Sequence, residues 1–168
     1  MDVRQSQYHR DYADMPLIDI RTALVTDLTD IQSCARLAYS KYISRIGREP
    51  APMHADYASL VGYGYIDVAI LDSHFVGYVV FYPEGDHFHL ENVAILPEYG
   101  GLGIGKRLID HVECSAEEKG YEAVELYTNE AMIENLAMYP KLGYVRGECR
   151  HEAGFNRVYF RKQLKLNG

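Results

Sequence analysis

The segment YGGLGIGKRL, residues 99–108, holds four glycines within six positions, between an apolar run at 93–96 and a stretch with helical periodicity. Glycine permits positive φ angles and lets a ligand approach the backbone closely. Successive amides at a helix N-terminus can then converge on an oxyanion, whereas a merely tight turn needs only one or two glycines. The residues that supply these amides, with Lys106 as an adjacent positive charge, are Gly101, Leu102, Gly103, Ile104 and Gly105. The segment therefore predicts a phosphate-binding loop.

Two well-known phosphate-binding patterns fit this loop less well. Gly100, Gly105 and Lys106 satisfy the P-loop spacing, but Arg107 stands where a hydroxyl should bind Mg²⁺. The dinucleotide pattern fails, because it requires glycine at position 106 or 108 and finds lysine and leucine. A P-loop NTPase is kept as an alternative, and a diphosphate held mainly by backbone amides is the preferred interpretation.

Composition and charge narrow the class of protein. The chain has 168 residues, 48% of them apolar, which suffices for one domain with its own core. A net charge of −7 argues against a general nucleic-acid binder, which needs a basic face. Three widely spaced cysteines indicate neither a disulfide framework nor a zinc site. We find no signal peptide and no 18-residue apolar run, and therefore expect a cytoplasmic protein without a membrane partner.

Alternation and helical periodicity predict a mixed sheet of seven strands with helices, an α/β (α+β) fold. Residues 1–16 are polar and lack periodicity, so we expect an N-terminal tail followed by one domain at 17–168. Helices are predicted from Thr26 to the break at 47–52, and over 53–64, 104–119 and 130–139. The predicted strands are 17–24, 65–71, 75–82, 87–96, 123–128, 144–150 and 157–164.

Two motifs resemble those of the GNAT N-acetyltransferase superfamily. LENVAILPEYGGLGIGKRLIDHVE, residues 90–113, is similar to the acetyl-CoA-binding motif, with Gly103 and Gly105 at its glycine positions and Gly100 where glutamine or arginine is usual. ENLAMYPKLGYV, residues 134–145, is similar to a second motif of that family. The resemblance covers residues 17–165. It implies a mostly antiparallel seven-stranded sheet with helices on both faces, and a parallel fourth and fifth strand that splay apart.

The fourth strand carries the candidate base. If no bulge intervenes, alternation places His87, His89, Glu91, Val93 and Ile95 on one face. Glu91 matches the strand glutamate that resembles a general base in the family, with a merely structural glutamate as the alternative and His89 as the reserve base. The resemblance also implies that backbone groups of Val93, Ala94 and Ile95 bind the pantetheine arm. It requires no metal, although HFHLE alone is compatible with a two-histidine, one-carboxylate site.

The second motif supplies the candidate acid. Tyr139 matches the tyrosine that resembles the proton donor to the departing thiolate, and a core tyrosine is the alternative. Pro140 should end the helix or fix its last turn, because it disfavours helical geometry at the preceding residue. Asn135, one turn earlier, is a candidate coenzyme A contact. The family pattern usually has its asparagine at the position of Met132.

The resemblance implies acetyl transfer from acetyl-CoA to a primary amine of a small molecule or a protein. The alternatives are a non-catalytic acetyl-CoA-binding sensor and the P-loop NTPase. Dimerisation through the last strands is a further expectation from the family. Arg45 and Arg48 favour an acceptor with a carboxylate, and surface arginines are the alternative. The expected acceptor wall comprises Tyr39, Tyr42, Arg45, Arg48, Met53, His54 and Tyr57.

Overall fold

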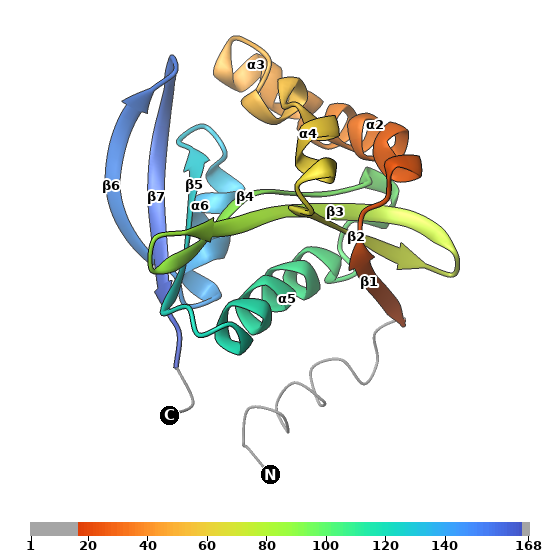
Figure 1. Cartoon of the computed structure of the whole chain (residues 1–168). Helices are drawn as coiled ribbons and strands as arrows, with labels where there is room; N and C mark the ends of the chain where they lie inside the picture. Colours follow the sequence, from red (N-terminus) through yellow and green to blue (C-terminus); the bar gives the residue numbers. More distant parts are fainter. Residues whose placement is uncertain (1–16, 166–168) are drawn as a thin grey trace.

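The computed structural model describes residues 17–165, so the predicted tail at 1–16 and the last three residues lie outside it. One seven-stranded sheet has the order β1-β2-β3-β4-β5-β7-β6 (Figure 1). Its strands are β1 (Ile18–Thr22), β2 (Ile66–Leu71), β3 (His74–Glu84), β4 (His87–Ile95), β5 (Ala123–Asn129), β6 (Val145–Glu152) and β7 (Phe155–Gln163). The α-helices are α2 (Leu28–Tyr39), α3 (Ile43–Ile46), α4 (Tyr57–Gly62), α5 (Ile104–Glu118) and α6 (Ile133–Lys141). The 3-10 turns are η1 (Val25–Asp27), η2 (Ser40–Tyr42), η3 (Ala51–His54) and η4 (Pro97–Tyr99).

The strand pairing confirms the mixed sheet and its divergent pair. All neighbouring strands are antiparallel except β4 and β5, which run parallel. Their pairing ends at Leu90 opposite Leu126, although β4 continues to Ile95 and β5 to Asn129. The two strands therefore separate toward their carboxyl ends. The edge strand β6 is almost wholly exposed, and dimerisation through the last strands stays a prediction.

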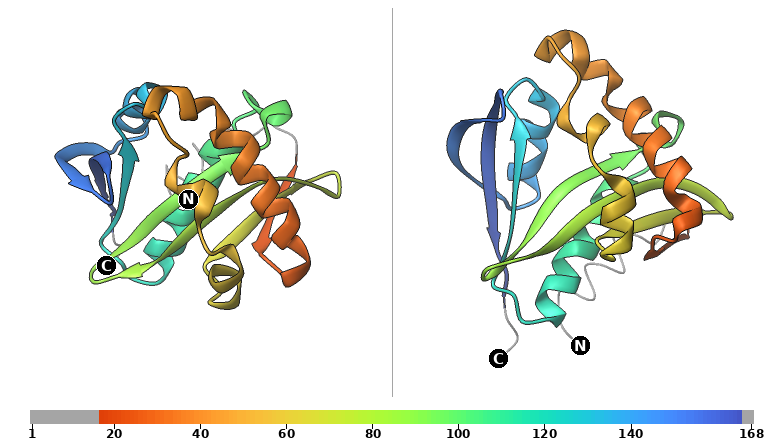
Figure 2. Two further views of the ribbon diagram at one scale, coloured as in Figure 1. Left: turned by 90° about the horizontal axis from the view of Figure 1, so that it is seen from above. Right: turned by 45° about the horizontal axis from the view of Figure 1, so that its top comes forward.

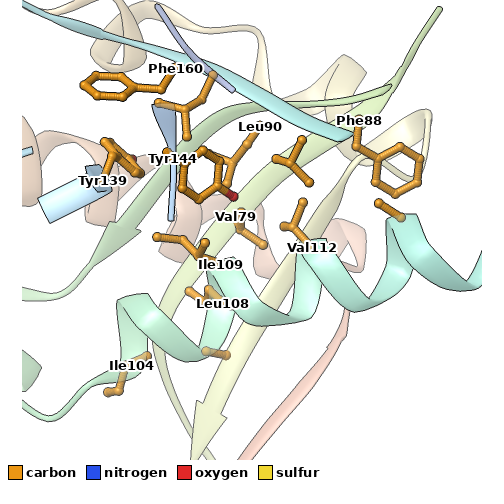
Figure 3. Packing of buried hydrophobic residues seen from close by; sticks show 14 of the residues in the cluster. Val79, Phe88, Leu90, Ile104, Leu108, Ile109, Val112, Tyr139, Tyr144 and Phe160 are labelled. Carbon is orange, nitrogen blue, oxygen red and sulfur yellow. The ribbon is translucent and has the colours of Figure 1, made fainter. Parts of the chain in front are cut away.

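Helices cover both faces of the sheet, as predicted. Figures 1 and 2 show α2, α3 and α4 on one face and α5 on the other. On the α5 side, Leu108 and Val112 are fully buried against strand residues such as Val79 and Leu90 (Figure 3). On the α2 side, Ile31 is fully buried in a second cluster, together with strand residues such as Val68 and Tyr78. Each such side chain contributes about 1.5–3 kcal/mol through burial, so both layers fix the position of β4 between them.

Helix α5 begins and ends where glycine permits it. Gly103 is the N-cap with a φ of +77°, and Gly120 follows the helix with a φ of +80°. Both angles lie in the left-handed region that other residues rarely adopt. The helix begins directly after the glycine loop, so the loop is held between the end of β4 and the first turn of α5.

A β-bulge in β4 corrects the predicted alternation. Val80 pairs with Asn92 and Phe81 with Leu90, so Glu91 has no partner on β3, and the pairing with β5 has already ended. An extra residue reverses which side chains face each side of a strand. Val93 and Ile95 consequently pack toward the α5 cluster. The prediction that they share a face with His89 and Glu91 is wrong, because the bulge lies between them.

Candidate active site

A cavity of about 230 Å³ lies where β4 and β5 separate. Residues from β4, β5, α5, α6, α2, β7 and the connector between α3 and η3 line it, so segments far apart in the sequence meet there. The predicted site residues among the lining are Glu91, Val93, Ile95, Gly105, Asn135 and Tyr139, together with Tyr39 from the expected acceptor wall. The structure thus brings the two predicted catalytic side chains to one cavity.

The glycine loop presents unused amides at the start of α5. Within residues 17–165, none of the N–H groups of residues 101–105 donates to a backbone carbonyl, and the first such bond runs from Arg107 to Gly103. Gly101 and Gly103 both have a φ of +77°. Aligned free amides at a helix N-terminus attract anions. Lys106 lies beside them and contacts Asp110 at 3.3 Å.

Arg107 distinguishes this loop from a P-loop, and Gly100 is the position at which it departs from the motif that it resembles. The Arg107 guanidinium donates to the carbonyl of Ile18 at 3.2 Å, on β1. It therefore points to the sheet edge, and its position supplies no hydroxyl for a metal. Gly100 has ordinary extended angles (φ −64°, ψ 151°), and a Cβ there would meet only the Pro97 carbonyl, at 3.2 Å. Nothing in the backbone conformation requires glycine at position 100.

Beyond the bulge, β4 offers backbone groups to the cavity. Leu96 N–H donates to the Val76 carbonyl on β3. Alternation along an antiparallel ladder then directs the N–H groups of Val93 and Ile95 away from β3, toward the side where β5 has separated. By the same alternation, the Ala94 N–H faces β3. Val93 and Ile95 are therefore the donors available to a bound ligand.

Glu91 is a carboxylate held by three donors. Its Oε2 accepts from Tyr82 at 3.0 Å and lies 2.6 Å from His89 Nε2, and its Oε1 accepts from Tyr127 at 3.1 Å. Burial acts to raise the pKa of Glu91, but the hydrogen bonds from His89, Tyr82 and Tyr127 outweigh it and hold the pKa below its usual value. Each carboxylate oxygen accepts about two hydrogen bonds. Oε1 therefore keeps one position for a ligand.

Tyr139 presents a neutral phenol to the cavity. Burial, with a smaller contribution from Tyr42, raises the pKa of Tyr139 well above its ordinary value. Its hydroxyl forms no hydrogen bond with the described residues, and its ring packs against Phe160 and Tyr144. Pro140 lies in the last turn of α6, as predicted. Tyr139 can therefore donate a proton or a hydrogen bond to a ligand.

Asn135 lines the same cavity from the previous turn of α6. Its Nδ2 donates to Thr128 on β5 at 3.2 Å. This bond ties α6 to the carboxyl-terminal half of β5. The side-chain oxygen Oδ1 of Asn135 has no hydrogen-bond partner among the described residues, so it can accept a hydrogen bond from a ligand.

Most of the expected acceptor wall is engaged elsewhere. Only Tyr39 lines the cavity, with its hydroxyl donating to the Val93 carbonyl at 3.0 Å. Arg45 pairs with Glu134 at 2.7 Å, and Arg48 donates to the Ala153 carbonyl at 2.6 Å. The other members pack or pair outside the cavity: Tyr42 is buried, Met53 is half-buried, His54 pairs with Glu49, and Tyr57 bonds Tyr78, Asn92 and the Pro52 carbonyl.

The structure adds site residues that the sequence did not indicate. Tyr82, Tyr127, Phe155 and Arg157 contact Glu91 or line the cavity. Tyr127 and Arg157 lie on β5 and β7, whose adjacency depends on the strand order. Among residues 17–165, no three histidine, cysteine, aspartate or glutamate side chains converge as a metal site requires. No helix in that part is long and apolar enough to cross a membrane.

Comparisons of the sequence with family models and with curated proteins point to the same family. The model of the acetyltransferase (GNAT) family matches residues 29–144. The [ribosomal protein bS18]-alanine N-acetyltransferase of Haemophilus influenzae is 29% identical over 90 residues, which are 53% of this chain. The match spans 61% of that relative, which is less than two thirds of its length.

Solved structures share the fold. The ribosomal-protein-S18-alanine N-acetyltransferase of Escherichia coli superposes with a TM-score of 0.74 at 18% identity, covering 90% of this chain and 97% of that one. The PaiA N-acetyltransferase of Thermoplasma acidophilum in complex with coenzyme A gives 0.65 at 18% identity, covering 88% and 99%. A GNAT acetyltransferase of Elizabethkingia anophelis with acetyl-CoA bound gives 0.65 at 20% identity, covering 88% and 98%.

Proposed function

Because the chain belongs to the acetyltransferase (GNAT) family, a family of enzymes, we propose that it transfers an acetyl group directly from acetyl-CoA to a primary amine. The acceptor is an amine of a small molecule or of a protein. One observation carries the proposal: Gly105 at the end of the glycine loop, Glu91 and Tyr139 all line the cavity between the separated strands, and within residues 17–165 the N–H groups of the loop are free.

The loop and β4 suit the donor substrate. The amides of residues 101–105 match the pyrophosphate of coenzyme A, which needs no metal when backbone donors surround it. The N–H groups of Val93 and Ile95 are proposed to bind the pantetheine arm and the thioester carbonyl. A donor aimed at that carbonyl stabilises the negative charge that develops on it in the tetrahedral intermediate.

Glu91 is proposed to bind and relay rather than to take the amine proton in one step. An alkylamine has a pKa of about 10.4, whereas the pKa of Glu91 is lowered from its usual value, so direct transfer of the proton to Glu91 is strongly unfavourable. The free position on Oε1 can instead hold the ammonium or a water that carries its proton away. The amine nitrogen then attacks the thioester, and Tyr139 donates a proton or a hydrogen bond to the departing thiolate sulfur.

The test measures binding and chemistry separately. Acetyl-CoA should raise the melting temperature, since a ligand bound only by the folded state stabilises it, and ATP with Mg²⁺ should not. A panel of amines with acetyl-CoA should release free thiol and give acetylated products by mass spectrometry. Thermal stabilisation without thiol release for any amine would support the sensor alternative, and stabilisation by ATP with Mg²⁺ alone would support the NTPase.

A further inference from the structure

Arg157 lies one side chain away from the candidate base, although its sequence neighbours carry no motif. It projects from β7 with a side chain that is 15% exposed, and it lines the same cavity as Glu91. Its guanidinium stacks 4.2 Å above the centre of the Tyr127 ring. The hydroxyl of that ring donates to Glu91. One tyrosine side chain therefore separates a cation from the carboxylate within the cavity.

The Arg157 guanidinium retains unused donors. Its Nη1 donates to Glu152 at 3.1 Å, and that is its one hydrogen bond with residues 17–165. A guanidinium carries five N–H donors, and among the described residues no unpaired side-chain nitrogen is buried, so the unused donors of Arg157 are open to a ligand in the cavity. Glu152 is in turn shared, because it also accepts from Tyr159 at 2.6 Å. The remaining donors suit an oxygen that enters the cavity.

Asn129 adds a second donor at the same place. It is the cross-strand neighbour of Arg157 in the β5–β7 pair, so the two side chains share a face. Its Oδ1 accepts the Ala131 N–H at 2.9 Å, which fixes the amide orientation and leaves Nδ2 as the outward donor. Within the described part of the chain, Nδ2 has no hydrogen-bond partner. This end of the cavity thus offers donors, whereas Glu91 only accepts.

The other arginines near this cavity do not compete for the same role. Arg45 is paired with Glu134, and Arg48 stacks 3.7 Å from the centre of the Phe155 ring while donating to a carbonyl. Of the cavity-lining residues among 17–165, Arg157 is the only lysine or arginine. Ile46 and Pro50 form an apolar wall nearby.

From these contacts we infer that Arg157 and Asn129 form an acceptor subsite for an oxygen next to the reacting amine. The acceptor then carries an α-amino group with an adjacent carbonyl or carboxylate: its nitrogen faces Glu91, its oxygen faces Arg157, and its side chain meets the apolar wall. This inference rests on the proposed function. Two sources share the chemistry, a free α-amino acid and the first residue of a peptide.

The first experiment compares acceptors that share the leucine side chain and differ in the group next to the amine. Because an adjacent carbonyl also lowers the pKa of the amine, kcat/KM is expressed per unprotonated amine for each acceptor. Isoamylamine is leucine without its carboxylate, leucinamide has a neutral carbonyl, and leucyl-glycine has a peptide carbonyl. Thiol release should give a kcat/KM for the preferred oxygen-bearing acceptor about 10- to 100-fold above that of isoamylamine, as for a hydrogen bond to a charged group. Leucine as the best acceptor identifies free amino acids. Leucinamide and leucyl-glycine as the best identify peptide N-termini.

The second experiment tests the residue. Arg157→Gln should lower kcat/KM for the preferred acceptor by about 10- to 100-fold, mainly through KM, and bring the ratio to isoamylamine close to one. Arg157→Lys should keep part of the preference. Arg150→Gln is the matched control, because Arg150 also stacks on a tyrosine, 4.4 Å from the Tyr159 centre, but lies outside the cavity. An unchanged acetyl-CoA thermal shift shows that each variant is folded.

Three results would overturn the inference. The wild type could use isoamylamine as well as the oxygen-bearing acceptors, which contradicts the subsite while leaving acetyl transfer intact. Arg157→Gln could lower kcat/KM equally for all acceptors, which indicates a structural role. If none of the amines supports thiol release, the proposed function and the subsite fail together.

Discussion

The two halves of the cavity differ in the groups that they offer to a ligand: one offers mainly backbone N–H groups, the other mainly side chains. The half proposed to bind acetyl-CoA, here the donor half, offers backbone groups: the amides of residues 101–105 and the N–H groups of Val93 and Ile95. The half proposed to bind the amine, here the acceptor half, offers side chains, among them Glu91, Tyr127 and Arg157. Backbone donors come from any residue in the right conformation, so that half depends on glycines and strand ends. The acceptor half depends on which side chains the sheet places together.

The largest effect should follow from removing the phenol where the two halves meet. Tyr139→Phe should lower kcat by about 10²- to 10⁴-fold, the range of general acid catalysis, and leave acetyl-CoA affinity nearly unchanged. Pre-steady-state and steady-state thiol release with a saturating acceptor would measure it. Tyr144→Phe is the control, because that ring packs edge-on against Tyr139 but donates to Glu113 in the core. An unaltered kcat with chemistry rate-limiting would exclude Tyr139 as the acid.

Glu91→Gln should act on the acceptor half through pH. Because the wild-type pKa of Glu91 is lowered, its carboxylate is ionised at neutral pH, where we expect it to bind the amine or the relaying water. The glutamine variant has no carboxylate, so its kcat/KM should be about 10²-fold lower at pH 7 and rise with pH toward the pKa of the acceptor amine.

The pH–rate profile checks this shift of the optimum. Glu84→Gln is the matched control, since Glu84 approaches His89 at 3.9 Å but is 61% exposed. If the Glu91→Gln profile coincides with that of the wild type, Glu91 is structural.

Gly105→Ala should separate stability from binding in the donor half. A Cβ there would meet only Ile95 Cγ1, at 3.9 Å, so the protein tolerates it. Alanine in a helix is favoured over glycine by about 0.5–1 kcal/mol, which should raise the melting temperature. The same methyl should weaken acetyl-CoA binding several-fold by keeping the pyrophosphate from the backbone.

Calorimetry of the apo protein and titration with acetyl-CoA would measure both effects. Gly62→Ala, at the end of α4 with nothing within 4 Å of its Cβ, is the control for stability alone. Equal acetyl-CoA affinity in wild type and Gly105→Ala would argue against close approach of the phosphates.

The smallest effect should come from Gly100→Gln, which restores a side chain that the family usually has. The backbone angles accept it, and only the Pro97 carbonyl lies near. One added hydrogen bond to the phosphates should tighten acetyl-CoA binding by about 2- to 10-fold, as titration would show. Gly100→Ala distinguishes the amide from simple stiffening of the loop. Weaker binding by Gly100→Gln would mean that the loop needs the glycine.

The difference between the halves also explains what could be predicted from the sequence. The glycine loop and Tyr139 lie in contiguous motifs, and local spacing sufficed to place them on a helix start and a helix end. Arg157 could not be found that way, because its contact with Tyr127 depends on β7 lying beside β5. The faces of β4 were mispredicted beyond Glu91, because a bulge depends on the register with β3 rather than on composition. Arg45 and Arg48 lie in the segment expected to form the acceptor wall. Their partners, Glu134 and the Ala153 carbonyl, are distant in the sequence and hold both side chains outside the cavity.

The bulge leaves Glu91 outside the strand pairing of the sheet. It is the one residue of β4 that pairs with neither neighbouring strand of the described sheet, so neither ladder depends on its presence. Deleting it would leave an ordinary strand, in which His89 and Asn92 keep their strand partners Tyr82 and Val80. A single inserted residue therefore places a carboxylate in the cavity without interrupting either ladder. Replacement of that residue would alter the chemistry of the cavity without altering the scaffold.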